Sequence, residues 1–268
     1  MSQGSERLAP REGRDPGRLV GSDRVLAVLR AVGARPEGAS LEELAHAVAS
    51  PKPTVHRALV ALRRAGFARQ DGHGRYCLGD EYLRLAFGYH QARPDHARVR
   101  PVLQALATRF GETAHYGVLD GRDIVYRAKV DPTAGAVRLT STVGGRNPAH
   151  STAIGLVLLA HDLRDLDAVR GWVSQGPLER RTARTLTTAA QLHDCFVQIR
   201  ERGYAVDDEA NEPWVACLAV PVSLHPDSTP SGAVSVTALT YRTPLAELVR
   251  ARAEIAEIVG PLCARGAG

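Results

Sequence analysis

The pattern of apolar positions in residues 40–79 predicts two short helices in succession. Each apolar set recurs at the three- and four-residue spacing of one helix face. The sets are Leu41, Leu44, Ala45 and Val48, and then Val55, Leu59 and Leu62. Ser40 and Glu43 form a capping-box pattern at the first helix start. Pro51 and Pro53 separate the helices, because proline ends a preceding helix but suits a first turn.

A short hairpin is expected directly after the second helix. Gly66 is placed to end that helix in a left-handed conformation. Residues 67–70 and 75–78 predict two strands, and residues 71–74, Asp-Gly-His-Gly, are typical of the turn between them. Helix, turn, helix and hairpin together are the layout of a winged helix-turn-helix, whose second helix enters the major groove of DNA.

The positive charge of the chain is concentrated in this part. The net charge is +5; residues 1–90 hold 14 Lys and Arg against 10 Asp and Glu, and the other residues hold 20 against 19. Such an excess favours DNA binding through counterion release, although a small three-helix unit with a solvated basic face is an alternative. The candidate DNA-contacting residues are Lys52, Pro53, Thr54, His56 and Arg57 at or near bases, and Arg63, Arg64, Arg69 and Arg75 at phosphates.

Beyond residue 112 the apolar period shortens towards two, which predicts strands. We expect them at residues 113–119, 123–130, 136–142, 204–208, 215–222 and 232–239, with a loop at 143–148. Helical patterns cover residues 23–32, 80–93, 95–110, 150–161, 165–174, 188–202 and 244–263. The fold class is therefore α+β, with an antiparallel sheet of five or six strands and packed helices in the second part.

Four segments follow from these patterns. Residues 1–20 are rich in Gly, Pro, Arg and Glu and are expected to form a disordered arm. Residues 21–80 form the DNA-binding domain, and residues 81–94 form a linker helix suited to dimer contacts. Residues 95–268 form a domain that is large enough to hold a small-molecule cavity between sheet and helices.

Three stretches of the second domain carry side chains suited to one pocket. Ser151 and Thr152 lie at a helix start, where free backbone N–H groups attract an anion. Residues 204–209 lead through an acidic Asp207 to a strand that includes Val215 and Cys217. Ser235 and Thr237, two residues apart on a strand, share one face. These groups would suit a small organic acid.

Simpler interpretations of the same residues remain open. Ser151 and Thr152 fit helix capping alone, and the acidic residues after Val206 fit a solvated turn. Cys217 fits a small buried apolar residue.

Two other functions remain open. One is a hydrolase or transferase that uses Cys217 as nucleophile and carries the first domain as an appendage. The other is a DNA-architectural protein without a ligand. We expect no catalytic residue and no cofactor, because the sequence lacks GxSxG, P-loop and HExxH motifs. We expect no metal, because His193 and Cys195 lie two residues apart on a helix and do not share a face.

Composition narrows the location of the protein. No apolar run approaches about 20 residues, so we expect no membrane span, and because the N-terminal stretch is polar we expect no secretory signal. The four cysteines, Cys77, Cys195, Cys217 and Cys263, are scattered without a CxxC pair. This distribution indicates reduced thiols and a cytoplasmic protein.

Several motifs together resemble the IclR (isocitrate lyase regulator) family of bacterial transcription factors. They are PKPTVHRALVALRRAGF, GRYCLGD, NPAHSTAIGLVLLA, RGYAVDDE, CLAVPV and GAVSVTAL, in order over about residues 22–262. The resemblance implies a winged helix-turn-helix, a linker helix and a GAF-like effector-binding domain. It also implies homodimers or homotetramers on operator DNA, and a small effector that is often an organic or aromatic acid.

The resemblance also implies positions for the effector site. They are Ala153, Ile154, Asp207, Val215, Cys217, Ser235 and Thr237. Three residues depart from the family pattern: Leu156 stands where a lysine is frequent, Ala210 replaces an acid, and Trp214 stands near a usual small residue. Trp214 is expected to narrow the pocket or to stack on an aromatic ligand.

Overall fold

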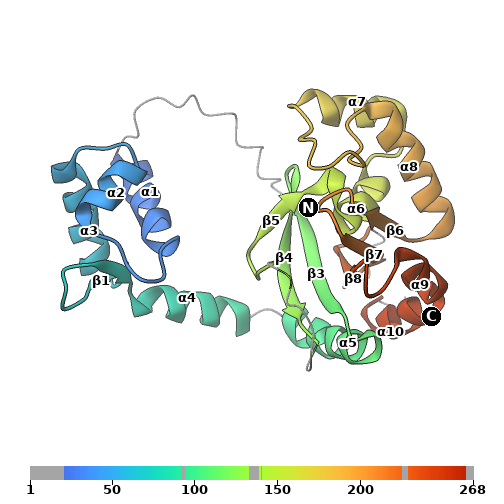
Figure 1. Cartoon of the computed structure of the whole chain (residues 1–268), viewed down its shortest axis with the longest axis horizontal. Coiled ribbons are helices and arrows are strands. Elements are labelled where there is room, and N and C mark those ends of the chain that lie inside the picture. The colour runs from blue at the N-terminus through green and yellow to red at the C-terminus, as the bar shows by residue number, and fades with distance from the viewer. Residues whose placement is uncertain (1–20, 92–93, 133–138, 140, 225–228, 264–268) are drawn as a thin grey trace, which may run out of the picture. The chain divides into compact units, whose positions relative to one another are not determined.

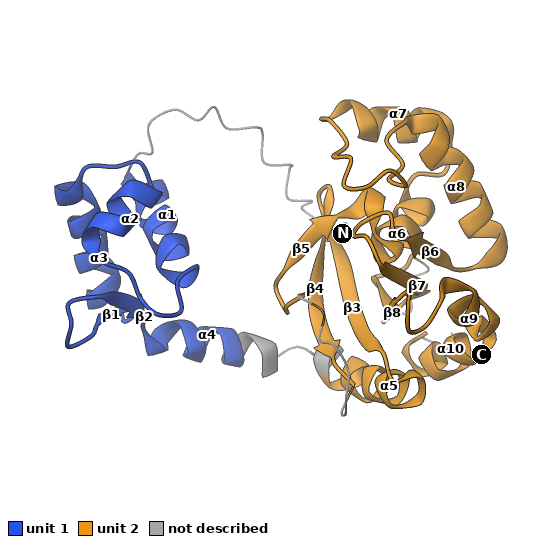
Figure 2. Cartoon of the chain, viewed as in Figure 1, with its two compact units in different colours: residues 1–93 blue, residues 94–268 orange. Residues whose placement is uncertain are grey.

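The computed structural model describes residues 21–91, 94–132, 139, 141–224 and 229–263. The chain divides into two compact units, residues 1–93 and 94–268 (Figure 2). The arm predicted for residues 1–20 lies outside the described residues.

The first unit has the predicted winged helix-turn-helix fold (Figure 1). Its elements are α1 (Gly21–Gly33), α2 (Leu41–Ala47), α3 (Lys52–Arg64), β1 (Ala68–Gln70), β2 (Tyr76–Leu78) and α4 (Asp80–Gln91). Leu44, Val55 and Leu59 are fully buried, and Tyr76 of the hairpin packs with them in one core. The apolar stripes of α2 and α3 therefore face each other, as their spacing predicts.

Local hydrogen bonds fix where these helices begin and end. The N–H of Glu43 donates to Ser40 Oγ at 3.2 Å, and the N–H of Ser40 donates back to Glu43 Oε2 at 2.7 Å. Gly66 has a φ of +77°, and its N–H and that of Phe67 donate to carbonyl oxygens of the last turn of α3. The predicted capping box and glycine-terminated helix are both confirmed.

The second unit is built on one six-stranded antiparallel sheet, in the order β5-β4-β3-β8-β7-β6. The strands are β3 (Thr113–Asp120), β4 (Asp123–Val130), β5 (Arg146–Pro148), β6 (Ala205–Asp208), β7 (Val215–Val222) and β8 (Gly232–Leu239). β5 corrects the loop expected over residues 143–148: it has no alternating pattern and becomes extended by pairing with the edge of β4. The strand expected at 136–142 lies largely outside the described residues, and residues 139, 141 and 142 are not in a strand.

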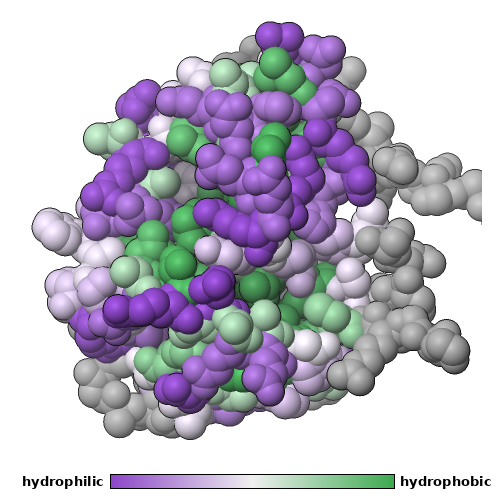
Figure 3. Space-filling model, turned by 90° about the vertical axis from the view of Figure 1, so that its right-hand side faces the viewer, coloured by the Kyte–Doolittle hydropathy of each residue, from purple (hydrophilic) through white to green (hydrophobic). Residues whose placement is uncertain are grey.

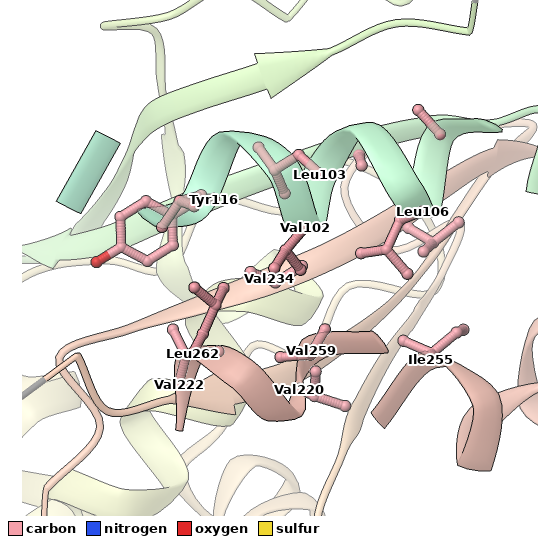
Figure 4. Close-up of a cluster of buried hydrophobic side chains, with 14 of the residues drawn as sticks. Val102, Leu103, Leu106, Tyr116, Val220, Val222, Val234, Ile255, Val259 and Leu262 are labelled. Atoms are coloured by element: carbon pink, nitrogen blue, oxygen red, sulfur yellow. The ribbon is translucent and has the colours of Figure 1, made fainter. Parts of the chain in front are cut away.

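Helices cover both faces of this sheet (Figure 1). One face packs against α6 (Ala153–Asp162); α8 (Ala189–Arg202) packs on α6, and α7 (Leu166–Ser174) packs on α8. The other packs against α5 (Pro94–Phe110), α9 (Leu245–Arg250) and α10 (Arg252–Val259). On this second face the core is formed by apolar side chains from α5, α10, β3, β7 and β8 (Figure 4).

The two faces differ in side-chain size. Alternation along β7 and β8 sends Leu218, Val220, Val234 and Val236 to the α5 side, where they fill the core. The opposite side receives smaller or polar side chains, including Cys217, Ala219, Ala233, Ser235 and Thr237. Small side chains leave space between the sheet and α6, and the cavity described below occupies part of that space.

Two predicted helices differ from the structure at their ends. The helix expected at 150–161 begins at Ala153, because Thr152 caps it and residues 149–151 form a separate 3-10 turn. The helix expected at 244–263 is interrupted at Ala251, where ψ is 4°. The interruption gives α9 and α10 separate directions, so that Leu248 and Ile255 both reach the core.

The surface of the second unit is mainly hydrophilic where Figure 3 views it, with apolar residues gathered near the middle of the view. Among the described residues, no helix combines the length and apolarity required to cross a membrane.

Candidate ligand cavity and nucleic-acid interface

A cavity of about 270 Å³ lies between the sheet of the second unit and the start of α6. Residues from all six strands, the start of α6, residues 139 and 141–145, Arg181 and residues 211–212 surround it. Its lining is His115, Tyr126, Leu139, Ser141, Thr142, Gly145, Arg146, Asn147, Thr152, Ala153, Ile154, Arg181, Asp207, Asn211, Glu212, Val215, Cys217, Ser235 and Thr237. Most of these side chains are polar, so the cavity suits a small ligand with several polar groups.

The structure brings together all but one of the pocket residues expected from the sequence. Thr152, Ala153, Ile154, Asp207, Val215, Cys217, Ser235 and Thr237 line the cavity. Ser151 does not: its hydroxyl is buried, with Oγ 3.0 Å from the Asn211 side-chain oxygen and 3.2 Å from the Pro148 carbonyl oxygen, and its one hydrogen is shared between these two acceptors. Ser151 thus holds Asn211, which is itself a lining residue.

The start of α6 reaches the cavity because of two local features. Thr152 Oγ1 accepts from the N–H of Gly155 at 3.2 Å, so capping and cavity lining occur together. Gly155 permits close approach to the preceding turn, since a Cβ there would lie 2.1 Å from the Ala149 carbonyl oxygen. The first N–H groups of a helix have no acceptor within it, so those of Ala153 and Ile154 are suited to bind an anion.

A chain of neutral hydrogen-bonding groups forms the floor. The Cys217 thiol donates to Thr237 Oγ1 at 3.3 Å, and the same hydroxyl lies 3.4 Å from Ser235 Oγ. The His115 ring contacts Thr237 Oγ1 through Nδ1 at 3.2 Å and Ser141 Oγ through Nε2 at 2.8 Å. Strands β3, β7 and β8 place these groups side by side on one face.

His115 is held neutral in this position. Burial, followed by the nearby charge of Lys129, lowers the pKa of its imidazole to about 3, although Asp131 acts in the opposite direction. Its ring lies against Tyr126, with 4.7 Å between ring centroids. A neutral imidazole between two hydroxyls can donate from one nitrogen and accept at the other, so it orients the floor without adding charge.

Asp207 is the most perturbed carboxylate of the cavity. Its side chain is 2% exposed, and burial raises the pKa to about 7. Oδ1 accepts from the N–H groups of Ala210 at 2.7 Å and Asn211 at 3.3 Å, which favours the charged form and limits the shift. The carboxyl group therefore shapes the turn after β6 and also faces the cavity. The sequence left open whether Asp207 belongs to a turn or to the pocket, and in the structure it belongs to both.

The environment of Cys217 disfavours nucleophilic chemistry. Burial, with the charge of Asp207 second, raises the pKa of the thiol. A reactive cysteine needs the opposite shift, from a neighbouring cation or helix start. His115 is close but neutral, and it lies one hydroxyl away, beyond Thr237. The arrangement fits ligand contact better than covalent catalysis.

One wall of the cavity is fastened by a buried lysine. Lys129 Nζ donates to the carbonyl oxygens of Leu139 at 2.9 Å and Ser141 at 2.8 Å, and it pairs with Asp131 at 3.1 Å. Its side chain is 11% exposed. These contacts hold residues 139 and 141 against the edge of β4.

Sequence reasoning missed several lining residues. They are His115, Tyr126, Leu139, Ser141, Thr142, Arg181, Asn211 and Glu212, whereas Gly145, Arg146 and Asn147 belong to the segment before the helix start that was expected at the pocket. For His115 a signal existed, because a histidine between the apolar Ala114 and Tyr116 points to the opposite face of its strand. The loop residues carried no comparable signal, since their approach depends on how the chain returns over the sheet.

Trp214 is not among the lining residues. Its side chain is 65% exposed, and its φ of +66° is one that a bulky residue rarely adopts. The expectation that Trp214 narrows the cavity is therefore wrong for this structure, since Trp214 is mostly exposed and does not line the cavity, whereas its stacking on an aromatic ligand stays a prediction.

The residues expected at DNA fall into two groups in the first unit. Pro53, His56, Arg57, Arg63, Arg64 and Arg69 are exposed, and Thr54 is half-buried. Lys52, Arg63 and Arg75 have protein partners. Lys52 pairs with Glu42 at 3.0 Å, and Arg63 donates to the Gln70 side-chain oxygen at 3.1 Å. Arg75 donates to the Gly38 carbonyl at 2.8 Å and lies 3.4 Å from Glu43. Arg75 thus fastens the hairpin to α2.

Among the described residues, no three His, Cys, Asp or Glu side chains are grouped to hold a metal ion.

Two protein-family models match the chain in order. Residues 22–72 match the IclR helix-turn-helix domain, and residues 93–263 match the bacterial transcriptional regulator IclR C-terminal domain. The HTH-type transcriptional regulator KdgR of Escherichia coli is 36% identical over 201 residues, covering 74% of each chain. The regulator BhcR of Paracoccus denitrificans is 35% identical over 209 residues, covering 78% of this chain and 74% of its own.

Solved structures show the same fold. The Thermotoga maritima IclR structure superposes with a TM-score of 0.73 at 23% identity, covering 89% of this chain and 95% of its own. An IclR homolog from Microbacterium hydrocarbonoxydans, complexed with 4-hydroxybenzoate, gives a TM-score of 0.70 at 22% identity, covering 89% and 97%.

Proposed function

The chain belongs to the IclR family of bacterial transcriptional regulators, and from that premise we propose how it binds operator DNA and how a small effector alters that binding. The observation that carries the proposal is that one unit has a basic, exposed α3 and the other has a cavity lined mainly by polar side chains. An effector changes DNA affinity only if it binds the DNA-competent and incompetent arrangements unequally.

In this proposal α3 lies in the major groove. Thr54, His56 and Arg57 reach base edges, with Lys52 and Pro53 at the helix start, and Arg63, Arg64 and Arg69 reach phosphates. Because Arg75 already contacts Gly38 and Glu43, we expect it to contribute less to DNA binding than its charge alone would imply.

The effector we propose is a small organic acid with additional polar groups. Its carboxylate would lie at the N–H groups of Ala153 and Ile154, near Arg146 and Arg181 at the cavity wall. Its other polar groups would meet the floor made by the hydroxyls of Ser235 and Thr237, the His115 ring and the Cys217 thiol.

A thermal-shift screen of small carboxylic acids tests the effector site; 4-hydroxybenzoate belongs in it because one structural relative binds that acid. A ligand at 100 times its Kd stabilises a protein by about 2.7 kcal/mol. We expect at least one acid to raise the Tm of the wild type and to do so much less in Thr237→Val, which keeps the side-chain volume but removes the shared hydroxyl. A stabiliser that acts equally on both proteins would place the site elsewhere.

We also propose that α4 contributes to a homodimer. Tyr82, Leu83, Leu85 and Phe87 are each about half exposed on this helix, and large apolar side chains gathered on one short helix mark an interface. A two-fold dimer would present two α3 helices to a pseudo-palindromic operator.

Light scattering tests the dimer. Phe87→Glu should shift the protein towards monomer, because it places a charge in the proposed interface. Gly88→Glu, at an exposed position of the same helix with open space around its Cβ, adds the same single charge and tests whether charge alone has that effect. An unchanged mass for Phe87→Glu would exclude Phe87 and its surroundings on α4 from the dimer interface.

A further inference from the structure

A groove lined by arginines runs beside the helix-turn-helix, on the side away from the acidic residues of α2. It encloses about 950 Å³ between α1, the turn from α2 to α3, and the start of α3. Its arginines are Arg24, Arg30 and Arg35 from α1 and the loop after it, and Arg57 from α3. No Asp or Glu is among the described residues that line it.

The floor of the groove is made of small side chains. Ala27 and Ala31 lie one turn apart on α1 and face Ala47 at the end of α2. Alanine side chains leave room for a ligand backbone to approach, and the arginines that line the same groove supply the positive charge. Arg35 is held in place there, since its guanidinium donates to the Ala31 carbonyl at 2.9 Å.

Cations on the two sides of α3 differ in how they are neutralised. On the α2 side Lys52 pairs with Glu42 and Arg75 with Glu43. On the groove side, Arg30 and Arg57 are exposed and form no salt bridge within the part of the chain that the structure describes. Arg30 and Arg57 therefore place uncompensated positive charge at the groove. It adds to that of Arg63, Arg64 and Arg69, which are exposed outside the groove and likewise form no salt bridge among the described residues.

We propose that this groove binds the phosphodiester backbone of DNA next to the segment that α3 contacts, with Arg30 as its principal phosphate contact. The inference rests on the proposed function, since it takes α3 to lie on DNA. Thr54 and Arg57, expected at DNA from the sequence, form one wall of the same groove, so the two surfaces are continuous. α1 thereby widens the footprint without reading sequence, because phosphate contacts carry no base information.

The test measures binding of the full chain to a fluorescently labelled mixed-sequence duplex of about three helical turns, by anisotropy at salt concentrations from about 50 to 200 mM. Arg30→Ala removes the proposed contact. Ala27→Glu leaves every arginine in place but puts a carboxylate on the groove floor. Arg252→Ala, at an exposed position of the second unit, removes one positive charge away from the groove and is the matched control.

Arg30→Ala should weaken binding several-fold and flatten the salt slope by about one unit, because one phosphate contact is lost. Ala27→Glu should weaken binding at least as much, and Arg252→Ala should keep the wild-type slope. Melting curves check that each variant is folded.

If the wild type binds the duplex but Arg30→Ala and Ala27→Glu both keep the slope of Arg252→Ala, the groove assignment is wrong and the proposed function stands. If the wild type binds no duplex under these conditions, the proposed function fails, and the groove assignment fails with it.

Discussion

At the scale of single residues, the cavity owes its character to which side chains share a sheet face. Ser235 and Thr237 could be placed together from the sequence, because their spacing of two fixes a common face. The contact of Thr237 with His115 and Cys217 could not, since it depends on the strand order β3-β8-β7. The pairing of β6 with β7 places Asp207 beside Cys217, where burial rather than an ion pair controls the charge of the Asp207 carboxyl group.

Asp207 makes folding stability depend on pH. Its folded pKa of about 7 lies above the reference value of 3.8, so the folded state disfavours the ionised form. The contribution of Asp207 to the free energy of unfolding is fully present below about pH 4 and is lost as pH rises through 7. It amounts to about 4 kcal/mol at 1.36 kcal/mol per pKa unit. Asp207→Asn can still accept the two N–H bonds but cannot ionise.

We therefore expect Asp207→Asn to gain stability relative to the wild type as pH rises from 5 to about 8. Urea unfolding at each pH measures the difference between the two proteins. The difference is needed because buried His115, whose pKa is lowered, makes both proteins more stable as pH rises towards about 6.5. This trend is opposite to that of Asp207 and cancels when the two proteins are compared. A pH-independent difference would show that Asp207 titrates normally.

At the scale of elements, local chemistry in the sequence placed most helices and strands. The capping box at Ser40, the φ of Gly66 and the alternation of β7 and β8 required no tertiary knowledge. The errors have a common cause. β5 is extended only because β4 offers an edge, and the C-terminal helix bends at Ala251 because two helices must reach one core. Both outcomes depend on partners distant in sequence.

The start of α6 gives an element-scale prediction. Replacing glycine by alanine within a helix normally stabilises it by up to about 1 kcal/mol. At Gly155 the new Cβ would instead lie 2.1 Å from the Ala149 carbonyl oxygen, so α6 must separate from the 3-10 turn. Gly171, within α7, has no heavy atom within 4 Å of such a Cβ and serves as the control.

Gly155→Ala should lower the free energy of unfolding by about 2 kcal/mol or more, a value typical of backbone displacement in a core. Gly171→Ala should leave it unchanged or raise it. Chemical denaturation compares the two variants. Equal small effects at both positions would mean that the helix start tolerates a side chain and does not depend on close packing.

At the scale of the whole molecule, function requires the two units to be coupled. An effector that lowers DNA affinity by some factor must have its own affinity lowered by DNA by the same factor. The sequence already indicated both parts, through the basic helix and the hydroxyl pair Ser235 and Thr237. Neither the sequence nor the cavity names the effector, because many small acids share the chemistry that its lining selects.

Preference for a specific DNA sequence tests the central claim most directly. The measurement is the ratio of Kd values for a duplex that the full chain selects from a random pool and for its scrambled counterpart, at physiological salt. We expect a ratio of about 10³ or more for the wild type, and a smaller ratio for Arg57→Ala. Arg69→Ala should weaken both complexes alike, since phosphate contacts do not depend on sequence. Equal affinity of the wild type for both duplexes would contradict the account.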